Sequence, residues 1–160
     1  MLELPHTQGC LVCGKQNPHG LHLSLFVDES TNIVSLTYTP LPEHIGFEGI
    51  VHGGILATVL DEAMVWAATW HNKIFCVAGE MNIRFRLGAT VGEQLNVTAQ
   101  VLSQRRNIIE TVGQIRSPAG VVATATGKYI PVSPDRNKHF LSTLVSEPST
   151  TQAARLLTRT

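Results

Sequence analysis

Charged side chains are scarce in this chain, and neither sign is in excess. Asp, Glu, Lys and Arg make up 15% of the 160 residues, with 12 basic residues against 12 acidic ones. A balanced charge gives no electrostatic preference for nucleic acid or an anionic membrane, so we expect neither as a partner. The low charge, beside 43% hydrophobic residues, predicts that further copies cover part of the surface. We expect a homo-oligomer, either a dimer or a tetramer.

A membrane-spanning run and a secretion signal are also missing. The most apolar stretch, residues 53–70, is interrupted by Asp61 and Glu62, whereas a spanning helix needs about 20 consecutive apolar residues. Residues 1–5 lack the basic and apolar regions of a signal peptide. These observations predict a soluble, cytoplasmic protein.

The chain has only three cysteines, and an odd number argues against a disulfide framework. Cys10 and Cys13 have the spacing of half a zinc site, but a structural site needs four ligands and no second such pair exists. Nearby histidines could complete one: His6, His19 and His22. The simpler interpretation is a pair of reduced thiols in an ordered loop, so we expect no metal and no cofactor.

Hydrophobic periodicity divides the chain into two strands, one helix and four further strands. The expected strands are 21–27, 33–39, 74–87, 94–105, 108–117 and 121–130, and the expected helix is 53–70. Short turns favour antiparallel pairing, and a helix that is apolar on all sides must be covered by the sheet. The prediction is an α+β fold in which about six antiparallel strands wrap one long helix.

This domain is expected over residues 21–132, with flanking segments of different character. Residues 1–20 read as a loop rich in Gly, Cys, Asn and Pro. Residues 133–160 read as a tail outside the core, either a short helix or partly disordered.

Two adjacent acids in the apolar helix need a physical reason, because burying an unpaired charge is costly. Asp61 shares a helix face with Gly54 and Ala57, whose small side chains leave room for a ligand. Asp61 can then act as base or nucleophile, while the N–H of Gly53 or Gly54 at the helix start polarises an acyl oxygen. Glu62 faces elsewhere, and we assign it a structural or orienting role. The alternative is that the glycines only permit close packing and a buried hydrogen bond holds Asp61.

The spacing within this segment favours a site shared between two chains. Gly54 and Asp61 are seven residues apart, which is about 10 Å along a helix. Gly54 and Asp61 of the same helix are therefore too far apart to contact one carbonyl group together. For the two residues to act on one substrate, they must come from two helices related by a two-fold axis.

Three segments carry a resemblance to a known family. Residues 49–64 read GIVHGGILATVLDEAM, residues 79–86 read GEMNIRFR, and residues 10–21 read CLVCGKQNPHGL. They resemble hotdog-fold acyl-CoA thioesterases, in particular the phenylacetic-acid-degradation-type branch of the 4-hydroxybenzoyl-CoA thioesterase superfamily. The resemblance spans residues 8–131.

The resemblance implies a hotdog fold, a dimer formed at sheet edges and often a tetramer, and hydrolysis of an acyl-CoA thioester. It implies that Asp61 activates water or attacks directly. It also implies that the backbone N–H of Gly54 or Gly53 polarises the thioester carbonyl, with His52 beside it. Coenzyme A enters as part of the substrate, and no separate cofactor is implied.

The chain departs from the family at Ala78, where members commonly carry Thr or Ser to bind the attacking water. Thr58 is a candidate substitute. Arg84 and Arg86, on the polar face of one strand, are candidates for binding CoA phosphates because guanidinium groups suit phosphate. Ala78 keeps open a second hypothesis, a non-catalytic hotdog module that binds CoA esters. A third, a dehydratase or hydratase using His52 with Asp61, is disfavoured by the His-Gly-Gly context.

Overall fold

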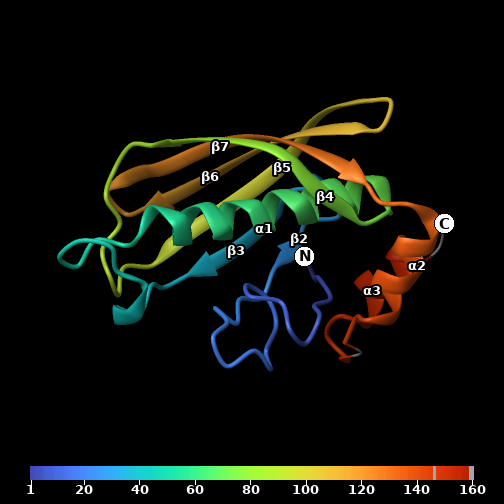
Figure 1. The fold of residues 1–160 in the computed structure, drawn as a ribbon, viewed down its shortest axis with the longest axis horizontal. Helices are drawn as coiled ribbons and strands as arrows, with labels where there is room; N and C mark the ends of the chain where they lie inside the picture. Colours follow the sequence, from blue (N-terminus) through green and yellow to red (C-terminus); the bar gives the residue numbers. More distant parts are fainter. Residues whose placement is uncertain (146, 159–160) are drawn as a thin grey trace.

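A seven-stranded antiparallel sheet curves around one long helix (Figure 1). The structure is a computed structural model that describes residues 1–145 and 147–158. The strands are β1 (Leu2–Glu3), β2 (Phe26–Val27), β3 (Val34–Tyr38), β4 (Cys76–Phe85), β5 (Leu95–Arg105), β6 (Ile108–Ser117) and β7 (Gly120–Pro131). The helices are η1 (Pro42–His44), α1 (Gly53–Asn72), α2 (Pro134–Ser142) and α3 (Thr151–Leu157). The predicted α+β hotdog architecture is confirmed.

The strands lie in the order β1-β2-β3-β5-β6-β7-β4. β4 precedes β5 in the sequence but pairs with β7 at the sheet edge, so the chain crosses the sheet between them. The hairpin predicted from 21–27 and 33–39 forms, but only Phe26–Val27 of its first arm is strand. Leu21 and Leu23 instead donate their N–H groups to Leu11 and Val12 of the N-terminal loop.

Helix α1 runs two residues beyond its predicted end. Its first turn is capped by His52, whose side chain accepts a hydrogen bond from the N–H of Gly54. It ends at Lys73, which adopts the left-handed conformation and donates its N–H to the carbonyl of Thr69. None of the described helices is long and apolar enough to cross a membrane.

The helix packs closely on the inward face of β6 and β7 because glycines make room for Met64. A Cβ placed on Gly113 would lie 3.0 Å from the Met64 sulfur. One placed on Gly127 would lie 2.9 Å from the Met64 terminal methyl and 2.7 Å from the ring of Tyr129. Inward residues of β5, β6 and β7 are buried against α1, while their outward neighbours are mostly polar.

Gly127→Ala tests this close approach. We expect it to lower the free energy of unfolding by about 1–3 kcal/mol, the usual effect of overpacking a filled core. Gly9→Ala is the matched control, because a Cβ at Gly9 meets nothing within 4 Å, and it should change stability by less than about 0.5 kcal/mol. Chemical denaturation of both variants makes the comparison, and equal midpoints would contradict the packing described here.

The C-terminal segment contains two helices and contributes to the core. Ala153 and Leu157 of α3 are almost fully buried and belong to the same apolar cluster as α1. The expectation of a tail wholly outside the core is therefore wrong for α3. Residues 146 and 159–160 of that predicted tail lie outside the described residues.

Candidate active site

The start of α1 presents one uncommitted backbone donor. Gly54 donates its N–H to Nδ1 of His52 at 2.9 Å. Since Nδ1 accepts this bond, a neutral His52 ring carries its proton on Nε2. The N–H of Gly53, one residue earlier, donates to no residue in the described part of the chain. Of the two glycines considered from the sequence, Gly53 therefore has the donor free to meet a ligand.

Asp61 lies two turns further along α1 and faces strand β7. The Tyr129 hydroxyl donates a hydrogen bond of 2.7 Å to Oδ1 of Asp61. Burial, followed by the nearby Asp61 charge, raises the pKa of Tyr129, so the phenol keeps its proton and remains a donor. Oδ2 of Asp61 makes no hydrogen bond with the described residues. The carboxylate is thus held at one oxygen and available at the other.

Tyr129 is a site residue that sequence reasoning missed. It is completely buried and follows Ala123, Ala125 and Gly127 on the inward face of β7. This period-two pattern was the available signal, because it turns the Tyr129 ring toward the helix. The pattern does not identify the acid that the hydroxyl meets.

Glu62 faces away from Asp61, as the helical period predicts. Its Oε1 accepts a hydrogen bond from the Trp66 indole at 3.1 Å, and Cys10 of the N-terminal loop lies beside it. Burial raises the pKa of Glu62 to about 7, with the Cys10 charge acting in the same direction. The two acids therefore occupy separate environments, and only Asp61 faces the sheet.

Thr58 and Ala78, the two positions considered from the sequence for binding the attacking water, both lie near Asp61. Thr58 donates its hydroxyl to the carbonyl of Gly54 at 2.9 Å, so that proton is already used within the helix. Ala78 pairs with Tyr129 across β4 and β7, beside a register shift between Ala78 and Glu80. The position that lacks the family hydroxyl is thus adjacent to the tyrosine that holds Asp61.

The two arginines predicted to bind CoA phosphates lie toward the other end of β4. Arg84 and Arg86 are exposed, and Phe85 between them is close to the start of α1. A Cβ placed on Gly53 would lie 3.4 Å from the Phe85 ring. Within one chain, the structure thus groups the arginines with Gly53, and Ala78 with Tyr129 and Asp61.

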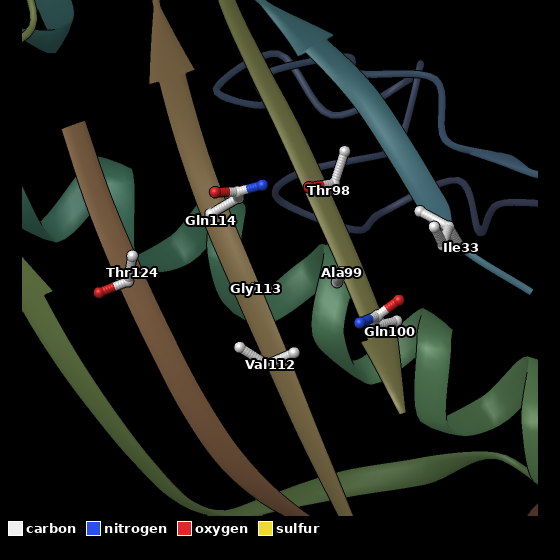
Figure 2. A pocket seen from close by; sticks show the side chains of 8 residues that line it. All are labelled: Ile33, Thr98, Ala99, Gln100, Val112, Gly113, Gln114 and Thr124. Atoms are coloured by element: carbon white, nitrogen blue, oxygen red, sulfur yellow. The ribbon is translucent and has the colours of Figure 1, made fainter. Parts of the chain in front are cut away.

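A hollow of about 450 Å³ lies on the outer face of the sheet. Figure 2 shows the residues that line it, with α1 behind the strands. Its lining includes the outward side chains of Thr98, Gln114 and Thr124. None of the residues predicted to bind or react with substrate lines it. Asp61 lies on the opposite, inward face, so this hollow is separate from the candidate active site.

A family model and solved structures match the chain. Residues 48–124, which include Gly53 and Asp61, match the model described as "Thioesterase superfamily". A crystal structure of a thioesterase superfamily protein is similar, with a TM-score of 0.70 and 24% identity over 77% of this chain. The chain covers 60% of that protein's length. The comparison with curated proteins gave no match.

Two further structures have the same fold. A phenylacetic acid degradation-related protein from Ralstonia eutropha is 26% identical, with a TM-score of 0.61, covering 69% of this chain and 85% of that one. The smu.793 protein from Streptococcus mutans, solved with acetyl-CoA, is 16% identical, with a TM-score of 0.61, covering 69% and 89%. The resemblance inferred from the sequence is confirmed: the chain has the hotdog fold, and its segment 48–124 matches the thioesterase superfamily model.

Proposed function

We propose that this protein hydrolyses an acyl-CoA thioester. The observation that carries the proposal is Asp61, held at one oxygen by Tyr129 and free at the other, on a helix whose first N–H is uncommitted. The thioesterase superfamily match supports the reaction class, and the S. mutans neighbour solved with acetyl-CoA supports a CoA ester as substrate.

In the proposed reaction, the N–H of Gly53 donates to the thioester oxygen as negative charge develops there. Such a donor contributes about 3–4 kcal/mol to transition-state stabilisation. Asp61 takes a proton from water, whose oxygen adds to the acyl carbon. Alternatively, the Asp61 carboxylate attacks that carbon itself, and water then hydrolyses the resulting Asp61–acyl anhydride, which releases the acid and restores the carboxylate. In both routes the C–S bond breaks and the CoA thiolate takes up a proton. Water and CoA ester suffice, so no cofactor is involved.

The proposed site requires two chains. Gly53 and Asp61 are separated by eight residues, about 12 Å along α1, which is too far for one carbonyl group and its attacking water. Strand β4 offers a way to join two copies, because its outer edge is unpaired in the described chain. It is ten residues long and exposes Val77 and Phe85. Edges of this kind readily pair with another strand.

The register of β4 supports one alignment for the two proposed copies. Ala78 marks the Asp61 end of the strand and Phe85 marks the Gly53 end. An antiparallel pair of β4 strands centred near Met81 and Asn82 sets the Ala78 end of one copy against the Phe85 end of the other. This brings the Gly53 donor of one copy toward Asp61 of its partner. The same alignment places Arg84 and Arg86 at the site rim, where we propose that they bind CoA phosphates.

A non-catalytic module that binds CoA esters is the second candidate, favoured by Ala78. The usual hydroxyl is missing there, and the Thr58 hydroxyl is already bonded to Gly54. Both candidates predict CoA-ester binding, but only the first predicts turnover.

Release of free thiol from a panel of short, long and aromatic acyl-CoAs separates the two candidates. The thioesterase proposal predicts repeated turnover with at least one acyl class. Binding of CoA esters, measured by calorimetry, without thiol release from any of them would contradict hydrolysis and favour the binding module.

A further inference from the structure

The N-terminal loop folds into a tight turn around the sulfur of Cys10. The N–H groups of Val12 and Cys13 both donate to Cys10 Sγ at 3.4 Å, and the N–H of Gly14 donates to the carbonyl of Cys10 at 3.0 Å. A Cβ on Gly14 would lie 2.5 Å from the carbonyl oxygens of Cys10 and Gln8. The turn therefore requires glycine after the second cysteine. Backbone donors aimed at a sulfur stabilise it as a thiolate, the form that binds metal.

This turn sits directly against Glu62 of α1. Cys10 Sγ lies 3.7 and 3.8 Å from the two carboxylate oxygens of Glu62. The ligand atoms of Cys10, Cys13 and Glu62 all lie within 4.8 Å of one another. For tetrahedral zinc, the usual bond lengths place a sulfur and an oxygen ligand about 3.6 Å apart. The measured spacing fits that geometry.

Neighbouring groups orient Glu62 and leave space beside the three candidate ligands. The Trp66 indole N–H donates to Glu62 Oε1, which fixes the carboxylate in place. A cavity of about 450 Å³ adjoins the three donors and is also lined by Phe75 and His139. It leaves space for a water molecule as fourth ligand. A half-buried carboxylate beside two thiols is costly by itself, and a divalent cation offsets that cost.

We propose that Cys10, Cys13 and Glu62 bind one zinc ion, which fastens the N-terminal loop to α1. The site lies on the side of the helix away from the Asp61–Tyr129 contact; Figure 1 shows the N-terminal loop and strand β7 on different sides of α1. Three protein ligands and one water give zinc an open fourth position rather than the four protein ligands of a closed structural site, and this site is separate from the proposed hydrolysis. The proposal departs from the expectation, drawn from the sequence, that this protein binds no metal.

The histidines considered from the sequence are placed elsewhere. His6 is buried near Glu147, with 3.9 Å between its Nε2 and the carboxylate. His19 is exposed, and His22 bonds to the carbonyl of Asn17. The third protein ligand is instead an acid from the middle of the helix.

Zinc content of the full-length chain, purified without a metal-affinity step, tests the proposal. We expect about one zinc per chain by elemental mass spectrometry, as for a single tetrahedral site. Cys13→Ser and Glu62→Gln should both reduce this to a small fraction. Cys76→Ser is the matched control and should retain full zinc, because Cys76 lines the same cavity but lies outside the cluster.

Cobalt substitution provides a readout that does not depend on how well the variants fold. Wild-type protein reconstituted with Co²⁺ should show thiolate-to-metal charge transfer and the intense visible bands of a tetrahedral site. A metal-free wild-type protein, a Cys10–Cys13 disulfide found by mass spectrometry, or zinc content unchanged in Glu62→Gln would each overturn the proposal.

Discussion

Replacing Asp61 by Asn is expected to lower kcat for acyl-CoA hydrolysis by about 10²–10⁴-fold, the range typical of losing a general base. Asn keeps the size of the side chain and an oxygen that can accept the Tyr129 hydrogen bond. It removes the negative charge needed to take a proton from water or to attack the acyl carbon. Steady-state thiol release with the best substrate of the panel measures the effect.

Two controls separate lost chemistry from lost structure in Asp61→Asn. The variant should keep the wild-type melting temperature within a few degrees and should bind CoA with unchanged affinity. Wild-type turnover in a correctly folded Asp61→Asn protein would refute the role assigned to this residue.

Tyr129→Phe gives a graded comparison in the same assay. The ring that packs against α1 remains, and only the hydroxyl that positions Asp61 is removed. A hydrogen bond to a charged group contributes about 1.5–3 kcal/mol, so kcat should fall by at least about tenfold. KM should stay nearly constant, because Tyr129 positions the acid and is assigned no contact with CoA. A rise in KM with kcat unchanged would contradict that positioning role.

Local patterns in the sequence were sufficient to predict most of the sheet and the central helix. β6 has its predicted bounds, and α1 begins at its predicted residue, because alternation and helical periodicity are properties of the segment itself. The strand predicted at 21–27 is mostly absent because the N-terminal loop satisfies its backbone groups. That competition involves a segment ten residues upstream, which local periodicity does not register.

Contacts between distant segments were not predictable from the sequence. Tyr129 meets Asp61 across 68 residues, and Cys10 meets Glu62 across 52. Both acids were singled out because charge is unexpected in an apolar helix. Their partners depend on which strand and which loop the fold sets beside each face of α1. The same limit applies to α3, which lies in a segment rich in Ser, Thr and Arg although its Ala153 and Leu157 pack in the core.

Gly53→Pro provides a way to remove the proposed backbone donor alone. Proline lacks an N–H and is favoured at the first position of a helix. His52, with φ −61° and ψ 130°, already has the extended conformation that precedes proline. We expect Gly53→Pro to lose about 10²–10³-fold in kcat. Gly53→Ala, which keeps the N–H, should remain close to wild type.

Mixing Gly53→Pro with Asp61→Asn tests most directly whether two chains build one site. Each variant alone should be nearly inactive. After subunit exchange at equal amounts, half of the dimers are mixed and each holds one intact site, so about a quarter of wild-type activity should return. Native mass spectrometry establishes that mixed dimers have formed. Mixed dimers without any recovered thiol release would contradict a site shared between Gly53 of one chain and Asp61 of the other.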